Sequence, residues 1–135
     1  GAAEGRTGAR IGRLRARAAR DDAALEQRRQ TVFSEIAASN EGGLRLDGHR
    51  LRHEPEAIVL RVLDAALDGI APDHEPPVPK RLERLETLVL EALLPALAEG
   101  RALRRTLRGV LIEADRKGAI RLAAAPPRRV FAKRR

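Results

Sequence analysis

A helical pattern without proline runs from about residue 9 to residue 38, and it limits what this chain can fold into. Its apolar positions recur at steps of four and seven; they are Leu14, Ala18, Leu25, Val32 and Ile36. A helix of about 27 residues is about 40 Å long, whereas a compact chain of this size has a radius of gyration near ~14 Å. We therefore interpret the helix as a connector that protrudes or docks against something else, ended by Asn40, Gly42 and Gly43.

Two further helices are indicated in the middle of the chain. Pro55 suits the first turn of a helix that runs to about residue 68, because its missing N–H costs nothing there. The stretch 73–79 contains three prolines and cannot be helical. The helix that follows should be kinked or restarted at Pro95 and should end at Gly100.

Strand signals are shorter. Residues 44–51 alternate around an Asp-Gly pair, which is a hairpin-type turn signal. Residues 106–112 and 119–124 are predicted to be two strands joined by a turn at 115–118. An isolated hairpin is marginal in water, so this one must lie on the two core helices. The predicted fold class is mainly α, of the α+β type, with a long N-terminal helix, two further core helices and a C-terminal β-hairpin.

The predicted organisation has three parts. Residues 1–40 form an N-terminal loop, expected to be frayed over its first eleven residues, and the connector helix. Residues 41–125 form a helical substrate-binding domain with the β-hairpin, and residues 126–135 form a basic tail. No apolar run approaches the roughly 20 residues of a membrane-spanning helix, so we expect no membrane partner and a cytoplasmic protein.

Positive charge is gathered near the carboxyl end. The formal net charge is +8, and residues 100–135 hold twelve basic and two acidic side chains, whereas residues 41–99 hold seven basic and twelve acidic ones. Such an excess attracts polyanions over roughly 8 to 10 Å at physiological salt. Nucleic acid is therefore the leading candidate partner.

The sequence contains few residues in arrangements that suit catalysis or metal binding. The chain has no cysteine, and its two serines lie on the connector helix, far in sequence from every histidine. His49 and His53 stand four apart but lack a third ligand, and Asp64 and Asp68 fit two solvated acids on a helix better than a cation site. No phosphate-binding glycine loop is present, so we expect no catalytic residue, no metal and no cofactor in this chain.

The candidate RNA-binding residues are the basic side chains around the predicted hairpin. Guanidinium groups there can grip successive phosphates. With two aromatic residues in the whole chain, base stacking is hard to supply, and double-stranded stems fit better than single strands. The predicted set is Arg101, Arg104, Arg105, Arg108, Lys117, Arg121, Arg128 and Arg129.

Four stretches, in order, resemble one known family. They are EGRTGARIGRL with RARAARDDAALEQR, LRLDGHRL with EAIVLRVLDAAL, PPVPKRLERLETLV, and TLRGVLIEADRKGAIRLAAAPPR. Together they resemble the segment after the catalytic domain in bacterial tRNA(Ile)-lysidine synthases, the family once called cell-cycle protein MesJ.

That resemblance implies the substrate-binding part of an enzyme that uses ATP to join lysine to the wobble cytidine of the CAU-anticodon isoleucine tRNA. In the family, an N-terminal SGGxDS loop binds ATP; the motif is absent here, so the chain should be inactive alone. The implied partners are tRNA and an upstream catalytic domain of the same protein, with an oligomer possible through the connector helix.

Two other classes stay open. The first is a DNA-binding helical regulator, although the Pro-rich connection between the two core helices is longer than a helix-turn-helix motif uses. The second is a structural domain whose connector helix docks a partner and whose arginines are only solvated.

Overall fold

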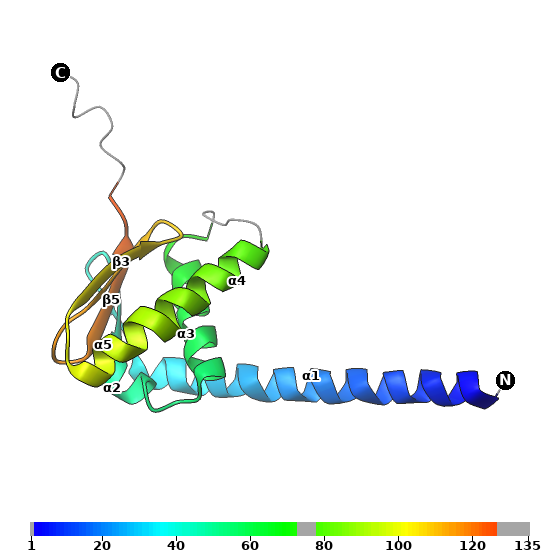
Figure 1. Cartoon of the computed structure of the whole chain (residues 1–135). Helices are drawn as coiled ribbons and strands as arrows, with labels where there is room; N and C mark the ends of the chain where they lie inside the picture. The colour runs from blue at the N-terminus through cyan, green and yellow to red at the C-terminus, as the bar shows by residue number, and fades with distance from the viewer. Residues whose placement is uncertain (1, 73–77, 127–135) are drawn as a thin grey trace, which may run out of the picture.

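A five-stranded antiparallel sheet with helices on one face forms the body of the protein, and a long helix extends from it (Figure 1). The computed structural model describes residues 2–72 and 78–126, and the side chains of 11–72 and 81–126. The helices are α1 (Ala2–Ile36), α2 (Gly48–Leu51), α3 (Glu56–Ile70), α4 (Val78–Glu86), the π-helix η1 (Thr87–Leu93) and α5 (Leu94–Glu99). The strands are β1 (Ala37–Asn40), β2 (Gly43–Asp47), β3 (Leu103–Leu107), β4 (Val110–Ala114) and β5 (Ala119–Ala124), in the sheet order β1-β2-β5-β4-β3.

The long N-terminal helix is present but has different ends from those predicted. It begins at Ala2, where a frayed loop was expected, and it ends at Ile36 rather than at about residue 38. The chain passes directly into β1, which pairs with β2 through a turn at residues 41–42. Gly42 has a φ of 83°, so the glycine expected to stop the helix instead makes a hairpin turn. This hairpin spans the predicted boundary at residue 40; the division into parts stays a prediction.

The predicted C-terminal hairpin belongs to a larger sheet. Strand 119–124 and the turn at 115–118 are confirmed, but residues 106–112 do not form one strand. The chain turns at Arg108 and Gly109, with φ of 52° and 71°, and this two-residue turn separates β3 from β4. Positive φ at both central positions matches the twist of a hairpin. The sequence predicted one continuous strand over 106–112 because a non-glycine residue such as Arg108 rarely adopts the positive φ that this turn requires.

The two core helices are confirmed, but the prediction that the whole stretch 73–79 is non-helical is wrong at its end. Val78 and Pro79 form the first turn of α4, where a proline is tolerated, while residues 73–77 lie outside the described residues.

Pro95 changes the register of this second core helix. The N–H of Leu94 bonds to the carbonyl of Val89, five residues back, in the π-helix that precedes the proline. A proline has no N–H and its ring clashes with the carbonyl four residues earlier, which the wider turn relieves. Gly100 then ends the helix in the left-handed conformation, as predicted.

The apolar core lies between the sheet and the helices. In β4 and β5 the side chains of Val110, Ile112, Ile120 and Leu122 are buried and face the helices, so the predicted strand segments do lie on the core helices. They meet the buried face of α3, which is formed by Ile58, Val59, Val62, Leu63, Ala66 and Leu67. The other face of the sheet has no helix over it (Figure 1). The fold class is therefore as predicted, with five strands in place of two.

Buried Val32 and Ile36 and a set of ion pairs together hold α1 to the body. Arg28 on α1 donates two hydrogen bonds, of 3.0 and 2.7 Å, to the carboxylate of Glu54, which precedes α3. Arg50 on α2 bonds to the same carboxylate and to Glu35 on α1. Farther along α1, every side chain from residue 11 to residue 24 is exposed. Within the described ranges, no helix has the length and apolarity that crossing a bilayer requires.

Candidate functional site

The structure distributes the predicted basic residues over several surfaces. Arg104 and Arg105 are neighbours on β3, so their side chains leave opposite faces of the sheet. Arg105 pairs in register with the buried Ile112 and lies on the helix side, at the edge strand, while Arg104 pairs with Glu113 on the outer face. Arg101 lies before β3 and pairs with Glu99. Arg128 and Arg129 lie outside the described residues.

Arg108 is not on the surface. Its side chain is 2% exposed, and its Nη1 lies 2.8 Å from Oδ1 of Asp64 and 3.6 Å from Oδ1 of Asp68. Arg81 on α4 contacts the same two carboxylates. The guanidinium of Arg108 therefore joins the β3–β4 turn to α3 and is not available to a phosphate. Asp64 and Asp68, interpreted from the sequence as solvated, are instead the acidic half of this ion-pair cluster.

A row of charged side chains crosses the outer face of the sheet. The strand register places Arg45 opposite Arg121, Arg121 opposite Glu113, and Glu113 opposite Arg104. Arg121 also lies 3.2 Å from Asp115, and Arg104 lies 3.8 Å from Glu113. Exposed ion pairs of this kind are worth about 0–1 kcal/mol, so an incoming phosphate can replace them. Arg45 was not predicted as a site residue.

The turn beside this row is held by Asp115. Its Oδ1 accepts hydrogen bonds from the backbone N–H groups of Lys117 and Ala119, at 2.9 and 3.0 Å. The bond from Ala119, together with that from Lys117 and the charge of Arg121, lowers the pKa of Asp115, so this carboxyl stays ionised. The turn is also tied to α2, because the N–H of Gly48 donates to the carbonyl of Gly118 at 2.8 Å. Lys117 thus projects from a fixed turn.

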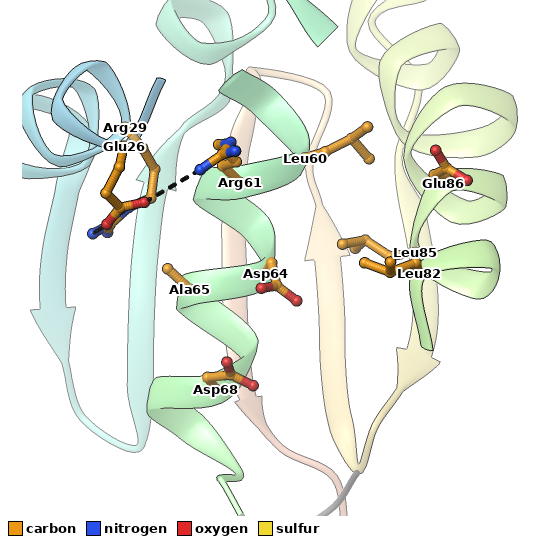
Figure 2. A pocket seen from close by; sticks show the side chains of 10 residues that line it. All are labelled: Glu26, Arg29, Leu60, Arg61, Asp64, Ala65, Asp68, Leu82, Leu85 and Glu86. Atoms are coloured by element: carbon orange, nitrogen blue, oxygen red, sulfur yellow. Dashed lines mark hydrogen bonds and ion pairs between the residues drawn. The ribbon is translucent and has the colours of Figure 1, made fainter. Parts of the chain in front are cut away.

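A hollow of about 540 Å³ lies on the helical side, between α1, α3 and α4 (Figure 2). Leu60 faces Leu82 and Leu85 across it, and Glu26 is joined to Arg61 at 3.6 Å. The pKa of Glu26 is lowered, mainly by its hydrogen bond from Arg29. Glu26 is paired with Arg29 and Arg61, Asp64 and Asp68 are engaged by Arg81 and Arg108, and the lining shows no nucleophile beside a base. We assign this groove no chemistry.

The residues considered for metal binding do not form a site. His49 is on α2 and its ring packs against Gly118, while His53 contacts Arg52. In the part of the chain that the structure describes, no three histidine, aspartate or glutamate side chains are grouped so that they could hold a metal ion.

Comparison with known proteins identifies relatives. The chain is 41% identical over 130 residues to a tRNA(Ile)-lysidine synthase of Methylobacterium nodulans, and 42% identical over 130 residues to one of Methylobacterium sp. strain 4-46. Each match covers 95% of this chain but only 38% and 37% of the relative, so the chain spans little more than a third of their length. No family model matches, and no solved structure matches.

Nearly the whole chain therefore matches one segment of tRNA(Ile)-lysidine synthases that are longer than the chain. The matches confirm the resemblance to the tRNA(Ile)-lysidine synthase family seen in the sequence, and their extent is consistent with a C-terminal region.

Proposed function

We propose that this chain is the tRNA-binding segment of a tRNA(Ile)-lysidine synthase. In the parent enzyme another domain would bind ATP and join lysine to the wobble cytidine of the CAU-anticodon isoleucine tRNA, in the cytoplasm. The chain itself would supply no catalytic residue. It would hold the body of the tRNA so that the anticodon reaches the catalytic domain.

The observation that carries the proposal is the similarity over 130 residues to two proteins with that name. The charge supports it, since a net +8 on a chain of this size favours a polyanionic partner. The aromatic content favours a duplex stem over a single strand as the ligand. Phe33 on α1 is the only Phe, Tyr or Trp among the described residues, so the sheet offers no aromatic side chain on which an unpaired base could stack. Of the predicted residues, those that support tRNA binding from the surface are Arg101, Arg104, Arg105, Lys117 and Arg121.

The test is the salt dependence of tRNA binding. The full chain is titrated with an isoleucine tRNA transcript carrying a CAU anticodon, between about 50 and 200 mM salt, with duplex DNA as competitor. About four phosphate contacts give a slope near −3 to −4 in log K against log salt, so affinity falls roughly a hundredfold over this range. A flat dependence contradicts the proposal.

Competition between tRNA and duplex DNA also tests the two alternative functions, a DNA-binding regulator and a partner-docking domain. Preference for duplex DNA over tRNA would favour a DNA-binding regulator. Absence of any nucleic-acid binding, with self-association through α1, would favour a partner-docking domain; Ile11 and Leu14 on that helix are 43% and 54% exposed.

A further inference from the structure

We propose that the outer face of the sheet holds a backbone phosphate of the tRNA between Arg45 and Lys117, with Arg121 beside them. This inference rests on the proposed function and names the surface that performs it. It adds Arg45 to the binding residues and leaves out Arg105, which lies on the helix side, and the buried Arg108.

The site is a shallow depression beside the row of arginines. It has a volume of about 280 Å³ and is lined by residues of α1, β1, β2 and the turn before β5. Arg45 and Lys117 contribute the positive charges of its lining, and Arg121 is the register partner of Arg45 on the next strand. Two cations, one from a strand and one from a turn, thus line one concave surface, and Arg121 lies next to Arg45 on the neighbouring strand.

The strand register places two positive charges opposite each other, and no carboxylate of the described residues pairs with both of them to offset the repulsion. Arg45 and Arg121 pair directly across β2 and β5. Like charges in this position destabilise a sheet. Arg121 has Asp115 as a partner, but among the described residues no carboxylate pairs with Arg45 or with Lys117. A phosphate between them would offset the repulsion and satisfy guanidinium donors that now face water.

The two acids in the depression are already engaged by the fold. Asp47 accepts a hydrogen bond from the N–H of Arg50 and caps α2. Asp115 accepts the two backbone N–H groups of the turn and contacts Arg121. Both carboxylates therefore have oriented donors, whereas the cations of Arg45 and Lys117 are free to meet an anion.

The row extends the site across the sheet. Strands lie about 4.8 Å apart, so Arg45 and Arg104, three strand spacings from each other, are separated by about 14 Å. Arg104 is 70% exposed and its contact with Glu113 is long, at 3.8 Å. One RNA strand running across the sheet can therefore meet Arg45 and Arg121 first and Arg104 afterwards, through its phosphates alone.

The test compares two double variants of the full chain that remove the same charge. The first is Arg45→Ala with Lys117→Ala, in the depression. The control is Arg52→Ala with Arg84→Ala, on the helical side of the molecule. Binding of the CAU-anticodon isoleucine transcript is measured at several salt concentrations, and circular dichroism with a urea titration confirms that each variant is folded.

We expect the depression variant to lose at least tenfold in affinity and to reduce the salt slope by one to two phosphate contacts. The control should stay within about threefold of the parent chain. Equal losses in the two variants would show that only net charge matters and would overturn the site. Unchanged binding by the depression variant would also overturn it while leaving the proposed function intact. If the parent chain itself does not bind tRNA, the proposed function fails first.

The variant Arg45→Lys adds a second measure. It keeps the charge but removes the planar pair of donors that fits a phosphate. If Arg45→Lys recovers part of the tRNA affinity that Arg45→Ala loses, a direct contact with a phosphate is supported. If the folded Arg45→Lys variant recovers none of that affinity, a phosphate held at this position is contradicted.

Discussion

Replacing Glu54 by Gln should loosen the attachment of α1 to the body of the protein. The Glu54 carboxylate is 6% exposed and takes a bidentate pair from Arg28 on α1 and a further bond from Arg50 on α2. Glutamine has nearly the same shape but no charge, and its amide N–H₂ would face guanidinium donors. The substitution therefore tests the charge at this junction rather than its packing.

The expected loss follows from the exposure of the partners. Removing one member of a fully buried ion pair costs about 3–5 kcal/mol. Arg28 and Arg50 are 47% and 36% exposed, so both regain water when the carboxylate charge is lost. Hydrogen bonds to charged groups are worth about 1.5–3 kcal/mol each. Because the two arginines regain hydration by water, we expect a smaller loss, of about 1–2 kcal/mol, in the free energy of unfolding. For a chain of this size that lowers Tm by roughly 3–10 °C.

The pH dependence provides an independent check. The hydrogen bond from Arg28, followed by that from Arg50, holds the pKa of Glu54 below its ordinary value. A carboxyl with a lowered folded pKa contributes stability above its unfolded pKa, near 4.5, and loses it as pH falls through the folded value. Glu54→Gln should therefore differ from the parent chain at pH 7 and converge with it in acid.

Urea titrations followed by circular dichroism at pH 7 and below pH 4 measure both effects. Glu41→Gln, in the exposed β1–β2 turn, removes the same charge and should change little. If Glu54→Gln were as stable as the parent chain at pH 7, or if its deficit persisted unchanged in acid, the ion-pair account of this junction would be refuted.

Three other substitutions have defined outcomes. Gly43→Ala should be strongly destabilising, because a Cβ there would lie 1.9 Å from the carbonyl oxygen of Leu122. Gly69→Ala should instead stabilise α3 by about 0.5–1 kcal/mol, because a Cβ there has nothing within 4 Å. If the urea midpoints of the two variants moved in the same direction, this reasoning would be contradicted. Arg108→Asn keeps a residue suited to positive φ but removes the contact with Asp64, so it should cost about 1–3 kcal/mol and leave tRNA affinity unchanged at temperatures where the variant is folded. A loss of affinity without a loss of stability would return Arg108 to the binding surface.

The parts of the fold that local signals determine could be predicted from the sequence. Helix α3 and the helix ending at Gly100 follow from apolar periodicity and from the conformations that proline and glycine impose. Strand β1 was missed because its sequence, Ala-Ala-Ser-Asn, has little β preference of its own. It is a strand because β2 pairs with it, and that pairing is not visible in the sequence of either segment alone.

The candidate site shows the same limit. The accumulation of basic residues after residue 100 indicated the partner class, but it did not say which face each side chain would take. One step along β3 sends Arg104 and Arg105 to opposite sides of the sheet, and the turn directs Arg108 inward to Asp64. Arg45 joins Arg121 only through strand pairing between distant segments, so no spacing rule could have found it.

The sheet order has a consequence during synthesis of the chain. Strand β5 lies between β2 and β4, so the hairpin that follows α1 reaches the rest of the sheet only through residues 119–124. While a ribosome is still making those residues, β2 and β4 each present an open edge that can pair with another nascent chain. Among the described strands, the one that emerges last therefore covers these two inner edges, and it leaves only the outer edges of β1 and β3 open.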